Sequence, residues 1–384
     1  MKSAKKSTRL LLSLWSAWFF VFLVRMSLKA ILPALKIEFN STHMELGFAI
    51  AALITAYSLI QIPAGYLSDR FEKKFIIIPG MFLASLGIFL ASFSQSIIVL
   101  IIFLFLTGLG LGTYYPAGIG LISNWFSKAE RGKTIGFHET ATSAGSVIGP
   151  ALGGIISSVY GWRIGFRFLG LIGLLVLPLI YLFGNQKESN NGDKKFSFIN
   201  NIRPLIPLII IFTLTAASWM GFTTYLATYL THIGYSEGMA GSMFSIMPAI
   251  SLVSMPIAGH FSDKFSRKKM LIFLLLASSP FIYLVSLLSS FYLICISLAI
   301  IGLTMFAAYP VVITYISDKI SQGVAGITFG FVNAISMGVS AIASPTVGYI
   351  IDVSNYRVAF LLISGLVIVS AIIISFEKEK TNQV

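Results

Sequence analysis

Charged residues and cysteine are both scarce in this chain of 384 residues. Only 11% of its residues are charged and 56% are hydrophobic, whereas a soluble domain carries roughly 25% charged residues. So few charges cannot cover the surface of a water-soluble enzyme of this size. The single cysteine, Cys295, excludes an intramolecular disulfide. The composition therefore indicates a chain that lies in a lipid bilayer.

Long apolar blocks decide which membrane fold to expect. Backbone in hydrocarbon must pair its own hydrogen bonds, so it forms helices or a closed barrel. A barrel shows segments of about 10 residues that alternate apolar and polar, but this chain has continuous apolar blocks of about 20 residues. We therefore predict an all-α membrane protein with twelve transmembrane helices. They are expected near residues 11–35, 46–67, 75–94, 97–124, 134–158, 163–183, 204–230, 238–260, 270–289, 291–316, 325–351 and 357–376.

The basic residues predict the orientation. The net charge is +13, but the Lys and Arg residues lie in short clusters between apolar blocks and form no basic face, so a nucleic-acid partner is excluded. If the N-terminus is cytoplasmic, the segments on that side hold 21 of the 27 Lys and Arg residues. By the positive-inside rule, both termini and the central loop are cytoplasmic and the protein is a multi-pass protein of the cell membrane.

The two halves of the chain repeat each other at an offset of 194 residues. Gly65 to Phe71 matches Gly259 to Phe265, Tyr115-Pro116 matches Tyr309-Pro310, and a stretch beginning at Arg163 matches one at 357. Several blocks in one register indicate duplication. We expect two pseudo-symmetric six-helix bundles, 1–184 and 204–384, joined by a polar cytoplasmic loop, 185–203, with a cavity between them near the midplane of the bilayer.

The loop after the second span carries the strongest motif, and it returns after the eighth span. Its residues, Gly65-Tyr-Leu-Ser-Asp69-Arg70-Phe-Glu-Lys73, resemble motif A of the major facilitator superfamily, and the resemblance covers nearly the whole chain. It implies that family's fold and alternating access, with cytoplasmic gating by charge contacts at helix ends. The gating residues so implied are Gly65, Asp69, Arg70, Lys73, Gly259, Asp263, Lys264 and Arg267.

The fifth span is unusually rich in glycine. Its pattern, G-x8-G-x3-G-P-x2-G-G, lets neighbouring helices approach closely and is similar to motif C of the same family, which is associated with antiporters. We expect these residues to serve helix packing: Gly136, Gly145, Gly149, Pro150, Gly153 and Gly154.

Two cations lie within the first span. Arg25 is near its centre and Lys29 follows one turn later on the same face. Charged side chains in lipid cost roughly 2.5–3.5 kcal/mol each. Two cations on one face repel each other and do not stabilise helix packing, but they are well suited to bind an anion. Anion binding has two alternatives. Lys29 would extend its ammonium group to the outer interface of the membrane, or Arg25 would form an ion pair and make no contact with substrate. The first-span arginine also resembles the organic anion/proton symporter branch.

Glu139 in the fifth span is the candidate proton carrier, with His138 beside it in the sequence. A partly buried carboxylate near an arginine can couple protonation to substrate occupancy. The alternative is a carboxylate at the helix end that faces the cytoplasmic loops. For the second half, we expect Trp219, Tyr225, Tyr309 and Asn333 to contribute to the substrate site, although aromatic residues in membrane helices also simply pack.

No nucleotide-binding motif, metal-ligand cluster or nucleophile–base pair is present in the sequence, so we predict no cofactor and no enzyme activity. Our prediction is a monomeric secondary active transporter that moves a small organic anion, held by Arg25 and Lys29, with protons coupled through Glu139. The main alternative is a proton-antiporting exporter of drugs or other lipophilic cations. A sensor with a transporter fold and a channel are further alternatives that the short tails and the repeat disfavour.

Overall fold

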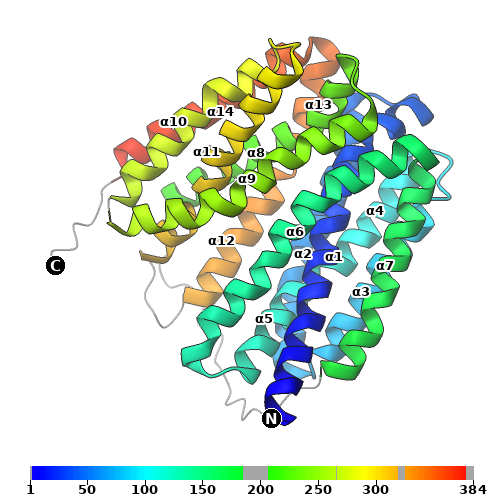
Figure 1. Ribbon diagram of the computed structural model, residues 1–384, viewed down its shortest axis with the longest axis vertical. Helices are drawn as coiled ribbons and strands as arrows, with labels where there is room; N and C mark the ends of the chain where they lie inside the picture. The colour runs from blue at the N-terminus through cyan, green and yellow to red at the C-terminus, as the bar shows by residue number, and fades with distance from the viewer. Residues whose placement is uncertain (1, 185–205, 265, 319–324, 378–384) are drawn as a thin grey trace.

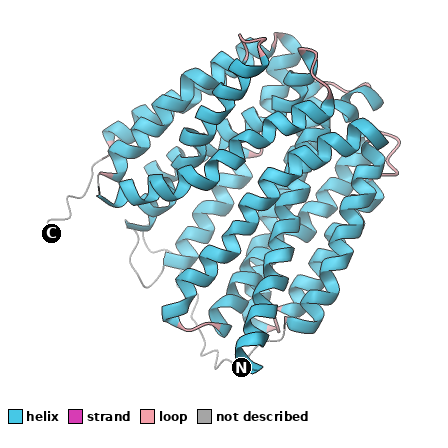
Figure 2. Cartoon of the chain, viewed as in Figure 1, coloured by secondary structure: helices cyan, strands magenta, loops and turns pink. Residues whose placement is uncertain are grey.

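The computed structural model describes residues 2–184, 206–264, 266–318 and 325–377, and the predicted loop 185–203 lies outside them. Every regular element in these residues is a helix (Figures 1 and 2). Helices are the expected result, because each one satisfies its own backbone hydrogen bonds in lipid. The helices of the first half are α1 Lys2–Glu38, α2 His43–Arg70, α3 Lys74–Ala91, α4 Ile97–Gly112, α5 Tyr114–Trp125, α6 Lys128–Tyr160 and α7 Trp162–Phe183. Those of the second half are α8 Ile206–His232, α9 Glu237–Lys264, α10 Arg267–Val285, α11 Phe291–Asp318, α12 Ala325–Ser340, α13 Ala343–Val353 and α14 Tyr356–Phe376.

Within the described residues, these helices provide twelve segments that are long and apolar enough to span a membrane. The number of helices is larger because α4 and α5 meet at Thr113 within one span, and the end of α12 shares one span with α13. The prediction of an all-α chain with twelve spans is confirmed. Figure 1 shows the chain as two groups of helices, α1–α7 and α8–α14.

Each group buries its own apolar core. One cluster of buried apolar side chains comes from α1–α7, with Met220 and Ala341 added, and a second comes from α8–α14. The groups touch through α6 on α9, α2 on α13 and α1 on α8. Figure 1 shows their helices converging at the end opposite the N-terminus and diverging toward the end where the N-terminus lies. The chain is therefore most tightly closed at the end away from its N-terminus.

Candidate substrate and proton site

Arg25 is buried in the middle of α1, and no acidic group among the described residues pairs with it. It is 8% exposed, and its guanidinium carbon lies 4.7 Å from the ring centre of Tyr57 and 5.0 Å from that of Phe22. Its Nε has no hydrogen-bond partner, and no carboxylate of the described residues lies within ion-pair distance of it. Cation–π contacts stabilise it in part. The charge itself is left uncompensated, which is unusual for a buried arginine.

Lys29 points across to the other half of the chain. It is 3% exposed, and its Nζ donates a hydrogen bond of 2.6 Å to Oγ1 of Thr223 on α8. It therefore does not snorkel to the interface. Thr223 stands at the offset of 194 residues from Lys29, so each is the other's counterpart in the repeat. α1 and α8 meet at matching positions, on the pseudo-two-fold axis between the halves.

Glu139 on α6 is tied to α1 by hydrogen bonds. Its Oε2 accepts from Nε1 of Trp18 at 3.2 Å and from Oγ1 of Thr142 at 3.1 Å. Its Oε1 lies 3.4 Å from Nδ1 of His138, and 39% of the side chain is exposed. The carboxylate is thus held against α1 and does not face the loops. The sequence signal for Trp18 was its position, seven residues before Arg25 and on the same helical face.

Arg25 and Glu139 are not joined by an ion pair in the part of the chain that the structure describes, but they act on the same hydroxyl groups. The charges of both bear on the Tyr57 hydroxyl of α2 and on the Tyr309 hydroxyl of α11. Tyr309 is 40% exposed, so the region between the two groups of helices is accessible at this level. The charges of a cation and a carboxylate of the first half thus both bear on phenols of the two halves.

The remaining candidates of the second half are placed differently. Trp219 packs edge-on against Phe306, with ring centres 4.0 Å apart. Tyr225 is fully buried, and its hydroxyl donates to carbonyl oxygens of His43 and Ser344. It thus belongs to a contact between the halves and not to the surroundings of Arg25. The side chain of Asn333 lies outside the described residues.

The motif after α2 is built around a buried lysine. Lys73 is 4% exposed, and its Nζ donates to the carbonyl of Ser68 at 3.1 Å. Its side chain also fills the space in front of Gly120 on α5, while Arg70 lies over the ring of Tyr66. The end of α2 is thereby tied to the start of α3. A Cβ added at Gly65 would lie 3.7 Å from Pro116, and one added at Gly259 would meet open space. Asp69 interacts with a neighbouring group. Lys264 is exposed and Arg267 is partly buried, whereas the side chain of Asp263 lies outside the described residues.

The glycines of α6 face different neighbours. A Cβ added at Gly145 would lie 2.8 Å from the carbonyl oxygen of Phe19, and Gly149 and Gly153 also face α1. Gly154 faces the backbone of Glu237 on α9, where Pro150 likewise contacts Gly241. Gly136 has no neighbour within 4 Å. The close approach of α1 and α6, which brings Trp18 to Glu139, thus depends on the middle of the motif.

Alanine at Gly145 is expected to lower the free energy of unfolding by about 1–3 kcal/mol, because its methyl group would overlap the backbone of α1. Gly136→Ala is the matched control. It meets open space, and alanine is about 1 kcal/mol more favourable than glycine inside a helix. Thermal unfolding of the purified variants in detergent checks both. Equal melting temperatures for the two variants would contradict the packing role.

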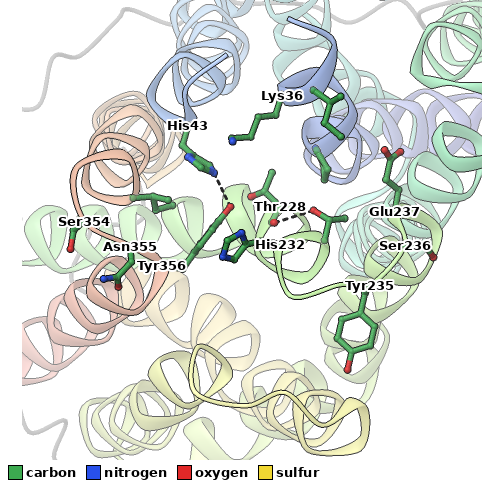
Figure 3. A pocket seen from close by; sticks show the side chains of 14 residues that line it. Lys36, His43, Thr228, His232, Tyr235, Ser236, Glu237, Ser354, Asn355 and Tyr356 are labelled. Carbon is green, nitrogen blue, oxygen red and sulfur yellow. Dashed lines mark hydrogen bonds between the residues drawn. The ribbon is translucent and has the colours of Figure 1, made fainter. Parts of the chain in front are cut away.

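The halves are joined by a hydrogen-bonded contact between His43 and Asp352 at the end opposite the N-terminus. Nδ1 of His43 on α2 lies 2.6 Å from Asp352 on α13, and Asp352 also accepts from the backbone N–H groups of His43 and Met44. The other ring nitrogen of His43 is 2.8 Å from the Tyr356 hydroxyl. Figure 3 shows His43 pointing at this hydroxyl, with His232 beside Tyr356. His43, His232 and Tyr356 line a cavity of about 570 Å³. Nothing in the sequence signalled this pair, because its members are 309 residues apart.

Two helical groups around an accessible cluster of charges are the arrangement of a membrane transporter that works by rocking its halves. A family model described as Major Facilitator Superfamily matches residues 14–254 and 208–383, and the chain belongs to this family. It is therefore a secondary transporter and not an enzyme.

Relatives of several kinds match over most of the chain. Multidrug resistance protein MdtG of Proteus mirabilis is 25% identical, over 92% of this chain and 93% of its own. The hexuronate transporter of Bacillus subtilis is 22% identical, over 96% and 94%. Among solved structures, a bacterial homologue of the human lysosomal transporter Spinster, in an inward-facing and occupied conformation, matches with a TM-score of 0.85 and 16% identity, over 95% of both chains. This last likeness shows the fold alone.

Proposed function

We propose that this transporter moves a small organic anion that binds at Arg25, with Lys29 beside it, together with a proton carried at Glu139. The observation that carries the proposal is the buried guanidinium without an acidic partner. An uncompensated cation in this environment is costly, and a carboxylate or phosphate bound by the planar fork of an arginine would compensate it. A relative named as a hexuronate transporter supports this substrate class.

The charges of the site also support coupling to protons. An anion at Arg25 places a second negative charge in the region where Glu139 lies, since both act on Tyr57 and Tyr309. Two like charges in a medium of low dielectric constant repel strongly. A proton on the carboxylate removes that repulsion and leaves the loaded site closer to neutral before the halves move.

The closed end indicates the state of the cycle. We propose that both termini are cytoplasmic, so the His43–Asp352 contact closes the outside and the protein stands in an inward-facing state. Return to the outward-facing state would require this contact to break. In the outward-facing state, the motif residues around Lys73 would hold the cytoplasmic ends of the helices together, which is their proposed gating role.

A melting-temperature screen tests the proposed substrate class. Purified protein in detergent is heated with organic carboxylates, phosphate esters and lipophilic cations, because a ligand that binds the folded state raises the melting temperature. Stabilisation by a carboxylate or phosphate ester is the expected result. Stabilisation by the cations alone would overturn the proposal.

Export of lipophilic cations by proton antiport is the second candidate. It is favoured by the partly exposed side chain of Glu139, which lies beside the aromatic ring of Trp18, and by a relative named as a multidrug resistance protein. Arg25 and Lys29 oppose it, since a cation would meet two like charges. In this case, stabilisation by cations would be lost in Glu139→Gln and unaffected by Arg25→Ala.

Glu139→Gln is expected to abolish accumulation driven by a pH gradient while leaving exchange of substrate across the membrane intact. Glutamine keeps an acceptor for Trp18 and Thr142 but carries no titrating proton. The measurement is uptake into proteoliposomes, with and without a pH gradient, of whichever anion the screen identifies. Accumulation that still follows the gradient would remove Glu139 from proton coupling.

A further inference from the structure

A chain of polar contacts runs from Glu139 into the interior of the first half. Oε1 of Glu139 faces Nδ1 of His138 at 3.4 Å, and Nε2 of His138 lies 2.8 Å from the Tyr114 hydroxyl on α5. That hydroxyl also lies 2.5 Å from the carbonyl oxygen of Leu14 on α1. The His138 ring is fully buried and lies nearly parallel to the rings of Trp18 and Tyr114, with ring centres 5.8 and 5.9 Å away.

The direction of these hydrogen bonds fixes the tautomer of His138. A carbonyl oxygen only accepts, so the single hydrogen of the Tyr114 hydroxyl goes to Leu14. The hydroxyl oxygen must then accept from His138, which places a hydrogen on Nε2. In a neutral imidazole with Nε2–H, Nδ1 carries a lone pair and no hydrogen.

Two acceptor atoms therefore face each other. Nδ1 of His138 and Oε1 of Glu139 are both buried and have no hydrogen-bond partner, while Oε2 of Glu139 already accepts from two donors. A lone pair aimed at a carboxylate oxygen across 3.4 Å is unfavourable. One added hydrogen between the atoms would turn this repulsion into a hydrogen bond. The contact of Nε2 with the Tyr114 hydroxyl sets the edge of the His138 ring that faces Glu139.

We infer that His138 Nδ1 and Glu139 Oε1 together form the proton-binding site of this transporter and share one proton. The inference rests on the proposed function for its role in transport, and it assigns the proton to a pair of atoms and not to Glu139 alone. The proton comes from water and reaches the exposed Glu139 side chain, because His138 is enclosed. Whether it lies on Oε1 or Nδ1, the pair is neutral, and without it the pair carries one negative charge.

The surroundings contain few other groups that titrate. Trp18 and Tyr114 contact the pair directly. Tyr115 of α5, Tyr57 of α2 and Tyr309 of α11 feel the charge of Glu139. Arg25 is the cation that acts on the same hydroxyls. Phenols keep their protons near neutral pH and arginine stays charged.

Nitrogen NMR of protein labelled with ¹⁵N-histidine, in lipid nanodiscs, tests the inference directly. The chain has four histidines, and the His138 signals are assigned by single replacement of His43, His232 and His260 by glutamine. At alkaline pH we expect the Nε2–H tautomer, and on acidification a single protonation step at Nδ1. In Glu139→Gln the amide N–H donates to Nδ1. Protonation of Nδ1 is therefore expected to be absent at the pH where it occurs in the wild-type protein. His260→Gln, an exposed position, is the matched control and leaves it unchanged.

Two outcomes would overturn the inference: an Nδ1–H tautomer at alkaline pH, or a His138 titration that is the same in Glu139→Gln and wild type. Because the probe is the proton itself, no substrate is needed. The inference can therefore fail while anion binding at Arg25 is found, and it can hold while the melting-temperature screen detects only cations. The test does not require the variant His138→Gln, because glutamine at this buried position would disturb folding.

Discussion

Lysine at position 25 is expected to weaken binding of the transported anion by about 10- to 100-fold, and alanine is expected to abolish it. Lysine keeps the positive charge over Tyr57 but lacks the planar guanidinium group, which donates hydrogen bonds to both oxygens of a carboxylate. Loss of one charge-assisted hydrogen bond costs about 1.5–3 kcal/mol, and 1.4 kcal/mol is a factor of ten in affinity. The measurement is the rise in melting temperature, or the affinity, with the anion that the screen identifies.

Arg167→Lys is the matched control for this substitution. Arg167 on α7 also lies over an aromatic ring, that of Phe93, at 4.8 Å, and it is partly buried. It lies far along the chain from the proposed site and is expected to leave affinity unchanged. Equal affinities of Arg25→Lys and wild type would exclude two-point binding of the anion, and a loss in Arg167→Lys of the same size would indicate a general effect on folding.

Alanine at Gly47 is expected to shift the protein away from the state closed at the His43–Asp352 end. A Cβ at this position would lie 2.5 Å from backbone atoms of Ser344 and Pro345 on α13. The helices of the other half must therefore move back. Overpacking costs about 1–3 kcal/mol, which corresponds to a change of about 5- to 150-fold in the balance between two states.

Thiol labelling measures this shift. In a Cys295→Ser background, Ser58→Cys places a thiol at a buried position of α2, and its rate of modification in detergent reports opening of the halves. Gly47→Ala is expected to raise the rate, and Gly365→Ala, whose added Cβ meets no atom within 4 Å, is the control. Equal rates in both variants would show that the contact at Gly47 does not limit opening.

Hydropathy and helical spacing predicted the spans and the shared face of Arg25 and Lys29, because both depend on the local sequence alone. The partners of these residues depend on how helices pack. Trp18 reaches Glu139 because glycines let α1 and α6 approach, and a pattern of glycines does not reveal which helix fills the space. Likewise, Tyr225 lies in the contact between the halves because its hydroxyl reaches the carbonyl oxygen of His43 on α2.

The hydrogen bond between Lys29 and Thr223 has a consequence for the symmetry of the fold. In a dimer of identical subunits, a residue on the two-fold axis faces its own copy. With lysine at this position in both subunits, the two ammonium groups would repel each other. With threonine in both subunits, the contact would carry no charge. A donor on one side and an acceptor on the other requires two different residues at the equivalent positions. The contact therefore depends on the two halves carrying different residues at this pair of positions.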